Sequence, residues 1–453
     1  MTAAIIQQTG LRLWSSRLGS VLLYGTFGLL MFGPIAFGSV EPWSMFTLET
    51  GATLLVLFWL AKQWIDGELK VKGNPLFLPM AVFALLIIAQ LVLGKTAYRH
   101  DTVSGGVLYG AYAMLCFLSS QTLLRNSQAR RLALVFSVYG AALACFALTQ
   151  GIAPNGKLYW MRTPRMGGSI YGPYVNHNHY AGLMEMLVPI PLVLSVSHLA
   201  TSRERMRAAV AAAVMAATIF LSGSRGGMLA FLAELLILAV FLVRQQRGIR
   251  TALSVGAFLL MVISLLTWIG GGELSRRISS ISKESRSEIS GGTRLTIDRD
   301  ALHMFVKKPV LGWGLETFPI VYPQFRSFYT NFFVNEAHND YLQLLVEMGL
   351  LGFATMLWFL IVVYRRAIRK IKNWTSEVSG AVTLACMLGC SGILVHSFVD
   401  FNLQIPANAA LFYVFCTIAA ADAFAQPIRK RRPIPTAAVP TETNEILPAS
   451  EVV

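Results

Sequence analysis

The stretch Glu336-Ala-His-Asn-Asp-Tyr-Leu-Gln-Leu-Leu-Val-Glu-Met-Gly-Leu-Leu-Gly-Phe353 joins a polar segment of the chain to a long apolar one. Its first residues include a histidine, an amide and two carboxyl groups, and the sequence beyond them stays largely apolar to residue 364. Asn339 or Asp340 can cap a helix that starts here, because a side-chain oxygen at the cap accepts a backbone N–H of the first turn. The stretch therefore predicts a membrane-spanning helix at 340–364 whose polar mouth carries His338.

The rest of the chain has the same apolar character. Hydrophobic residues make up 55% of the 453 residues and charged residues only 13%, and the mean hydropathy is +0.57. A single water-soluble core cannot hold so many apolar side chains, so we predict an all-α polytopic membrane protein. Apolar runs of spanning length predict about twelve transmembrane helices, at 19–40, 46–64, 76–94, 105–124, 132–152, 177–197, 208–223, 226–243, 251–270, 340–364, 378–398 and 406–425. They form one predicted transmembrane domain over residues 1–425, followed by a disordered basic tail over residues 426–453 that contacts anionic membrane lipid.

The charged residues indicate how the chain lies in the membrane. The net charge is +15, but the sequence has no folded basic module of the kind that binds nucleic acid, so we expect no nucleic-acid partner. With both termini in the cytoplasm, every short cytoplasmic loop is basic, as the positive-inside rule requires. The basic clusters are at 125–131, 203–207, 244–250, 365–372 and 429–432. The five cysteines all fall in apolar segments and are expected to be packing residues.

A long polar loop at 271–337 separates the ninth and tenth predicted spans and lies on the outer face in this topology. Apolar residues recur at helical spacing within 274–289 and 293–307, which predicts two amphipathic helices at the membrane surface. Lys308-Pro309 is expected to end the second helix, and an aromatic run follows at headgroup level. The loop leads directly to His338.

Arg225 belongs to one of four polar groups of residues that fall on this outer face. It lies between two spans and beside glycines, which let a ligand approach the backbone. A snorkelling anchor is the simple interpretation, but charges inside membrane segments are functional by default. We interpret Arg225 as an anion clamp, because its planar guanidinium suits phosphate oxygens.

Arg294 lies on the second predicted surface helix, four residues before Asp298. The simple interpretation is a surface ion pair, and the functional one is a second guanidinium for a lipid-linked phosphate. Asp298-Arg-Asp300 resembles an Asp-x-Asp metal motif, but residues two apart on a helix point about 200° away from each other. Because no third acidic ligand is nearby, we predict no metal site.

His338 adjoins the positive end of the helix that follows it, which favours the neutral imidazole and makes the ring able to accept a proton. An interfacial histidine that donates to a carbonyl is the alternative. Glu347 lies deeper in the same helix, where Gly349 and Gly352 permit close helix contact. We expect Glu347 to fix helix packing instead of performing chemistry.

Further polar residues on the outer face are candidates for substrate binding or support. His396 and Asp400 are four apart and are expected to share a face at the outer end of the eleventh span, where they could orient a substrate hydroxyl or tune His338. Capping and helix pairing are the alternatives. His177 and His179 are expected to diverge on entering a helix, so this segment predicts a hydrogen-bonding lip instead of a metal cluster. The other candidates are Arg162, Arg165, Asn176, Asn178 and Asn339.

Five short motifs follow one another between about residues 150 and 410. They are Gly172-Pro-Tyr-Val-Asn-His-Asn-His-Tyr-Ala181, Ser224-Arg-Gly226, Arg294 with Pro309-Val-Leu-Gly-Trp-Gly314, Ala337-His-Asn-Asp-Tyr-Leu-Gln343 with Glu347-Met-Gly349, and His396 to Pro406. As an ordered set they resemble the O-antigen ligase and polymerase superfamily of bacterial envelope glycosyltransferases.

The resemblance implies a GT-C-like, multi-pass enzyme of the bacterial inner membrane whose active site faces the periplasm, with the 271–337 loop on that side. It would move a glycan from undecaprenyl pyrophosphate to the lipid A-core oligosaccharide, with inversion and without a metal or other cofactor. Arg225 and Arg294 would neutralise the pyrophosphate, and His338 would act as general base on the attacking hydroxyl.

Other functions fit parts of the same pattern. An O-antigen or exopolysaccharide polymerase and a protein O-oligosaccharyltransferase would share the donor and the two arginines. A lipid-linked glycan transporter is an alternative of a different class. The sequence has no internal repeat of the kind that many transporters show, and its polar groups gather on one face, which weighs against transport.

Overall fold

The helices of the computed structural model follow the apolar runs of the sequence. The structure describes residues 2–164, 168–244, 260, 264, 291–330 and 333–425. Within these ranges the chain forms helices, turns and isolated bridges but no β-strand, which agrees with the all-α prediction. The helices are α1 (Thr2–Ile35), α2 (Pro42–Asp66), α3 (Phe77–Val92), α4 (Arg99–Thr122), α5 (Asn126–Ile152), α6 (His177–Leu187), α7 (Pro189–Val196), α8 (Ser202–Ser222), α9 (Arg225–Arg244), α11 (Gly291–Lys307), α12 (Phe318–Val321), α13 (Asp340–Lys370), α14 (Val378–His396) and α15 (Pro406–Ala420).

Nine spans in the described residues are long and apolar enough to cross a membrane, and α6 and α7 together make one of them. The shorter apolar helices α3 and α15 occupy two more of the predicted positions. The predicted span at 251–270 lies outside the described residues except at positions 260 and 264, as do the predicted helix at 274–289 and the tail 426–453. The chain is thus a polytopic membrane protein, while the count of twelve and the GT-C-like arrangement stay predictions.

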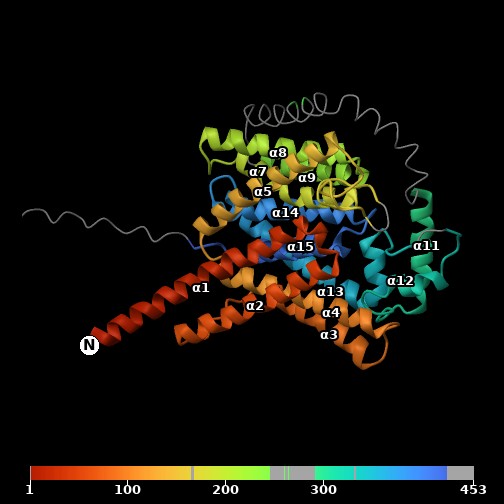
Figure 1. The fold of residues 1–453 in the computed structure, drawn as a ribbon, viewed down its shortest axis with the longest axis horizontal. Coiled ribbons are helices and arrows are strands. Elements are labelled where there is room, and N and C mark those ends of the chain that lie inside the picture. The colour runs from red at the N-terminus through yellow and green to blue at the C-terminus, as the bar shows by residue number, and fades with distance from the viewer. Residues whose placement is uncertain are drawn as a thin grey trace, which may run out of the picture.

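Helices α14 and α15 lie at the centre of the bundle, between α8 and α9 on one side and α1 to α4 on the other (Figure 1). Small residues allow this central position, because they let helix backbones approach closely. A Cβ added at Gly389 of α14 would lie 2.8 Å from the Cα of Met186, and one at Gly392 would lie 1.8 Å from Oε1 of Glu234. Helices at the periphery instead expose leucines such as Leu57 and Leu236, as expected where lipid surrounds the protein.

Helix α13 is interrupted at Gly349, which has a φ of 63° and a ψ of −168°. The loop segment 309–314 crosses the helix at this break. The N–H of Leu350 donates to the Pro309 carbonyl at 2.7 Å, and the N–H of Trp313 donates to the Val346 carbonyl at 2.9 Å. The loop therefore satisfies backbone groups that a continuous helix would have paired internally.

Glu347 ties the same loop to α13. Its carboxylate accepts the N–H of Glu316 at 2.9 Å and the N–H of Phe318 at 3.2 Å. These bonds agree with the expected packing function of Glu347.

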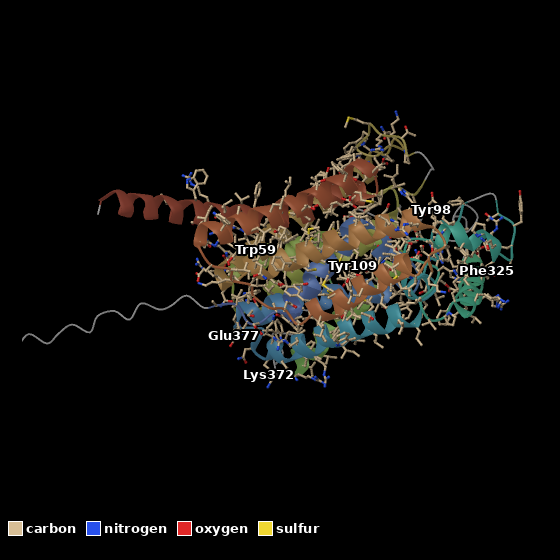
Figure 2. The ribbon with its side chains drawn as sticks, turned by 90° about the horizontal axis from the view of Figure 1, so that it is seen from below. Trp59, Tyr98, Tyr109, Phe325, Lys372 and Glu377 are labelled. Atoms are coloured by element: carbon tan, nitrogen blue, oxygen red, sulfur yellow. The ribbon has the colours of Figure 1, made fainter. Side chains whose placement is uncertain are left out.

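The two ends of the bundle carry different elements. Tyr98 and Phe325 lie at one end, near α11 and α12, whereas Lys372 and Glu377 lie at the other (Figure 2). The loop predicted to be outside and the basic cluster at 365–372, predicted to be cytoplasmic, are therefore separated by the length of the bundle.

Candidate functional site

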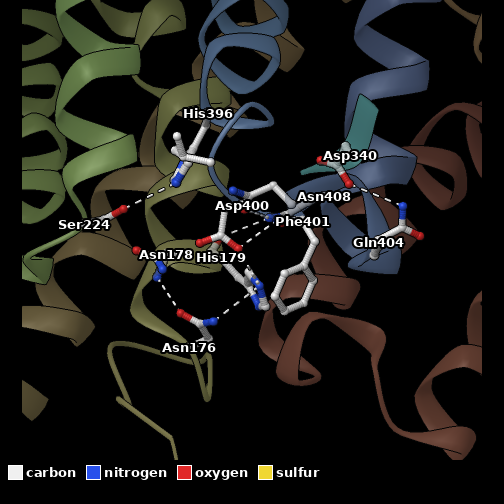
Figure 3. A network of polar contacts seen from close by, with 12 residues as sticks. Asn176, Asn178, His179, Ser224, Asp340, His396, Asp400, Phe401, Gln404 and Asn408 are labelled. Atoms are coloured by element: carbon white, nitrogen blue, oxygen red, sulfur yellow. Dashed lines mark hydrogen bonds and ion pairs between the residues drawn. The ribbon is translucent and has the colours of Figure 1, made fainter. Parts of the chain in front are cut away.

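Residues 396–401, between α14 and α15, form a turn. Figure 3 shows His179 and Asn176 of the α6 start beside Asp400 and Phe401 of this turn. Helix α14 ends at His396, and the N–H of Val399 donates back to the His396 carbonyl at 3.0 Å. The prediction that His396 and Asp400 share a face of one helix is therefore wrong, because the helix ends before Asp400. Asp400 is buried within the turn, with only 1% of its surface exposed.

His338 packs on this turn from the mouth of α13. Its ring meets Phe401 edge-on with the ring centroids 4.8 Å apart, and His179 of α6 meets the same ring at 4.7 Å. His338 has a φ of 55°, a left-handed conformation that costs a residue other than glycine about 1–2 kcal/mol. Asn339 caps α13, as predicted, by accepting the N–H groups of Tyr341 at 3.1 Å and Leu342 at 3.2 Å. The Asn339 cap therefore fixes the backbone next to His338, whose ring packs on the turn.

Arg294 reaches the turn from α11, whose bounds confirm the predicted amphipathic helix at 293–307. Its Nη1 donates to the Val399 carbonyl at 2.5 Å. The first turn of α9 packs against the same segment, since a Cβ at Gly226 would lie 2.4 Å from Cδ2 of His396 and 2.9 Å from Cγ2 of Val399. The exposed Arg225, which begins α9, therefore lies beside the turn that Arg294 contacts.

Burial and neighbouring charges set the ionisation of the site. Burial lowers the pKa of His338 to about 4, Arg294 lowers it as well, and Asp400 opposes both. The imidazole is neutral at pH 7, as predicted, although burial and not the helix end is the main cause. Burial alone would raise the pKa of Asp400, but His179, His396, Arg294 and His338 together hold it below its ordinary value. Asp400 is therefore ionised.

Four buried polar atoms of this cluster have no hydrogen-bond partner among the described residues. They are Nδ1 of His338, Nε of Arg294, Oδ1 of Asp298 and Oδ2 of Asp400. A buried polar atom without a partner costs about 1–3 kcal/mol, and natural structures keep few of them. All four lie around one turn, where a polar ligand would complete their hydrogen bonding.

The two aspartates of the Asp-x-Asp pattern point to different partners. Asp298 accepts from the side chain of Asn339, and burial raises its pKa to about 6 against that hydrogen bond and the charge of Arg294. Asp300 accepts the hydroxyl of Tyr322 at 3.2 Å and the N–H of Ser327 at 3.0 Å. In the part of the chain that the structure describes, no group of three or more His, Cys, Asp or Glu side chains is placed to hold a metal ion.

Comparison with known families gives a match over part of the chain that contributes to this site. Residues 210–357, which include Arg225, Arg294 and His338, match the family described as O-antigen ligase. This match confirms the resemblance to the O-antigen ligase superfamily. A comparison with curated proteins found no match. The function of the chain is thus of the O-antigen ligase or polymerase type.

Behind the 396–401 turn lies a buried chain of side chains that was not predicted. Oε1 of Glu185 in α6 is 2.8 Å from Nδ1 of His396, and Nε2 of His396 is 3.5 Å from Oγ of Ser224. Ser224 in turn accepts the N–H of Gly227 at 3.1 Å and so caps α9 just before Arg225. All three side chains are at most 1% exposed, so this chain of contacts lies buried beneath the start of α9. Glu185 could have been found, since it is the lone charge of an apolar run.

Asp340 holds the other side of the turn. The sequence predicted only that Asp340 could cap the following helix. Its Oδ2 accepts the Ser397 hydroxyl at 2.7 Å and the Leu403 N–H at 3.1 Å, and its Oδ1 accepts from Gln404 at 3.3 Å. The start of α13 and the connection from α14 to α15 are therefore held together.

Asn176, Asn178 and the neighbouring histidines occupy the start of α6. Asn176 caps the helix by accepting the N–H of the buried Asn178 at 2.9 Å. The histidines diverge, as predicted: Nδ1 of His177 is 2.8 Å from Oγ of Ser169, whereas Nε2 of His179 is 3.8 Å from Oδ1 of Asp400. This segment thus contributes His179 to the cluster.

Arg162 is bound to the connection between α1 and α2. Its Nη2 is 2.7 Å from Oε1 of Glu41, and its guanidinium lies 4.6 Å from the centre of the Phe37 ring. Arg165 lies outside the described residues.

Proposed function

We propose that this protein transfers a glycan from undecaprenyl pyrophosphate to the lipid A-core oligosaccharide at the periplasmic face of the bacterial inner membrane. The broader class rests on the family match over residues 210–357. The observation that supports the finer proposal is the convergence of Arg294, His338 and Asp400 on the 396–401 turn, where buried polar atoms lack partners among the described residues.

In the proposed reaction Arg225 and Arg294 bind the pyrophosphate of the donor. The acceptor hydroxyl oxygen forms a bond to the anomeric carbon from the opposite face, the bond from that carbon to the pyrophosphate oxygen breaks, and the configuration inverts. The hydroxyl proton passes to the neutral imidazole of His338, and undecaprenyl pyrophosphate leaves as an anion. Because fixed cations can stabilise this leaving group, the proposed transfer needs no metal ion.

Asp400 would assist the proton transfer. Its negative charge favours protonated His338, so it stabilises the imidazolium that forms as the hydroxyl loses its proton. Positioned general bases contribute about 10²- to 10⁴-fold to rate.

The positive-inside pattern supports the proposed orientation. The termini and the cluster at 365–372 would lie in the cytoplasm, and the 396–401 turn with α11 and α12 would face the periplasm. The separation of Lys372 from Phe325 along the bundle is in keeping with this arrangement.

The decisive experiment offers the purified protein a defined undecaprenyl-pyrophosphate glycan with one acceptor in each reaction. We expect product on the lipid A-core oligosaccharide, both in buffer and in EDTA. If product forms only when a second lipid-linked glycan is the acceptor, the protein is a polymerase. If product forms only on an acceptor protein, it is a protein transferase. Movement of the lipid-linked glycan across a vesicle without bond formation would identify a transporter. A strict requirement for a divalent ion would overturn the metal-independent step.

A further inference from the structure

A large cavity lies at the end of the bundle opposite the proposed active site. It has a volume of about 1480 Å³ and lies between α1, the last turns of α2, the connection from α2 to α3, and the junction of α4 with α5. Figure 2 shows Trp59, which lines the cavity, toward the end where Lys372 lies and away from Phe325. The cavity is therefore separate from the 396–401 turn.

The lining of the cavity carries an excess of positive charge. Its cations are Lys62, Lys70, Lys72, Arg125 and Arg131, and its anions are Asp66 and Glu68. Lys62 pairs with Asp66 and Lys70 pairs with Glu68, so both anions are already used. Arg131 donates to the Tyr24 hydroxyl at 2.6 Å. Lys72 and Arg125 form no ion pair with any described residue, which leaves two cations at the cavity for an external anion.

The surroundings of the cavity place it at the boundary between lipid and water. Its inner wall includes Leu22, Leu23 and Trp59, which are buried apolar residues. Trp14 and Trp64, on the same parts of α1 and α2, are 60% and 88% exposed. Exposed tryptophans prefer the headgroup level of a membrane. The cavity thus has a mainly polar lining that carries the cations, with a smaller apolar part of its wall beside it.

Hydrogen bonds hold the backbone of the two residues that carry the available cations. The backbone N–H and carbonyl of Lys72 bond the side chain of Gln121 of α4, each at 2.8 Å. The backbone N–H of Arg125 donates to Oε1 of Gln128 at 2.9 Å. Because this part of the backbone is fixed before binding, the protein loses less conformational freedom when a ligand binds.

We propose that this cavity binds the phosphate headgroup of an anionic phospholipid, with Lys72 and Arg125 as the residues that contact the phosphate. Arginine offers phosphate a planar set of donors, and basic pockets between transmembrane helices suit lipid headgroups. The apolar wall of the cavity accommodates the first carbons of the lipid chains. This proposal does not depend on the proposed glycan transfer.

Native mass spectrometry of the full-length protein tests the proposal. The protein is equilibrated with equal amounts of phosphatidylglycerol, which is anionic, and phosphatidylethanolamine, which is zwitterionic. We expect the unmodified protein to retain phosphatidylglycerol preferentially. The double variant Lys72→Gln with Arg125→Gln should lose at least about tenfold of that preference, because it removes both cations that contact the bound phosphate and each such contact strengthens binding by several-fold. If the double variant does not fold, the lipid preference of the single variant Lys72→Gln is measured instead.

The matched control removes two positive charges outside the cavity. Arg365 and Arg369 are exposed on the last turns of α13 and do not line the cavity, so Arg365→Gln with Arg369→Gln should leave the preference unchanged. Equal retention of both lipids by the unmodified protein, or an equal loss in both double variants, overturns the proposal. A third arm adds inorganic phosphate at millimolar concentration. Displacement of the bound lipid by phosphate would show a site for free phosphate and would also overturn it.

Discussion

Asp400 is surrounded by side chains that carry or can carry positive charge. His179, His338, His396 and Arg294 all act on this buried carboxylate, and it acts in turn on His338. The charge of Asp400 therefore favours protonation of the proposed base without being its main determinant, which is burial.

Replacement of His338 by asparagine separates the imidazole from the backbone geometry. Asparagine tolerates the left-handed φ of 55° better than most residues, so the fold around the α13 cap should persist. We expect kcat to fall by about 10²- to 10⁴-fold with little change in Tm, because the general base is lost. His303→Asn, on the exposed part of α11, is the control and should retain activity. Full activity of His338→Asn would remove His338 from the chemistry.

The pH profile should show the depressed pKa of His338. With a pKa of about 4 the imidazole stays neutral between pH 8 and pH 5, so kcat/KM should not fall near pH 6.5, where an unperturbed histidine titrates. The same shift means that stability contributed by the neutral ring is present above pH 6.5 and is lost as the pH falls toward 4.

Asp298 provides the control for that profile, since its pKa is raised to about 6. An inflection near pH 6 that disappears in Asp298→Asn belongs to this carboxyl group. An inflection near pH 6.5 that persists in Asp298→Asn would contradict the depressed pKa of His338.

At the scale of the elements, the start of α9 depends on the buried chain from Glu185 through His396 to Ser224. Glu185→Gln removes the charged acceptor of His396, a loss that costs about 1.5–3 kcal/mol for hydrogen bonds to charged groups. We expect KM for the donor to rise about tenfold or more, with a smaller change in kcat, because Arg225 loses its position. Steady-state kinetics with varied donor measures both.

Glu234→Gln is the control for this prediction. Glu234 is a buried carboxyl group of α9 whose oxygens have no partner among the residues described, so it does not belong to the chain that reaches Ser224. Equal KM values for Glu185→Gln and the unmodified protein would show that the chain does not position Arg225.

The break in α13 requires glycine at position 349. A Cβ there would lie 2.3 Å from the Val310 carbonyl oxygen, and the φ and ψ of 63° and −168° are accessible essentially to glycine alone. Gly349→Ala should therefore lower the stability by at least about 1–3 kcal/mol, seen as a lower Tm. Gly28→Ala is the control, since a Cβ at this helical glycine meets nothing within 4 Å. Equal Tm values for the two variants would contradict the strain at Gly349.

The elements that apolar runs and amphipathic spacing define could be predicted from the sequence, including α11 and the Asn339 cap. The predicted span 378–398 ends two residues after α14, but the turn that separates Asp400 from the helix could not be predicted, because bonds from distant residues hold it. Asp340 supplies one of these by accepting the Ser397 hydroxyl. Ordered motifs identified Arg225, Arg294 and His338, but the link from Glu185 to Ser224 depends on packing between α6, α14 and α9. No local pattern records that contact.

At the scale of the whole molecule, the proposed orientation can be tested with single cysteines in a cysteine-free background. Ser327 and Lys372 are both exposed, and Ser327 donates to Asp300 through its backbone N–H. Figure 2 shows Phe325, two residues before Ser327, at the end of the bundle opposite Lys372. In intact cells with a permeable outer membrane, we expect a membrane-impermeant maleimide to label Ser327→Cys but not Lys372→Cys. Lysis should expose both. Labelling of Lys372→Cys alone before lysis would reverse the orientation.

The crossing of α13 by the segment 309–314 has a consequence for biosynthesis. Residues 309–314 leave the ribosome before Val346 to Leu351, to which they later bond. The segment 309–314 therefore cannot form these bonds until α13 has been synthesised. The 396–401 turn is translated later still, so Arg294 meets its Val399 partner only after α13 and α14 have been made. A ribosome-bound chain truncated before residue 396 would thus carry both the arginines and the histidine without the turn that brings them together.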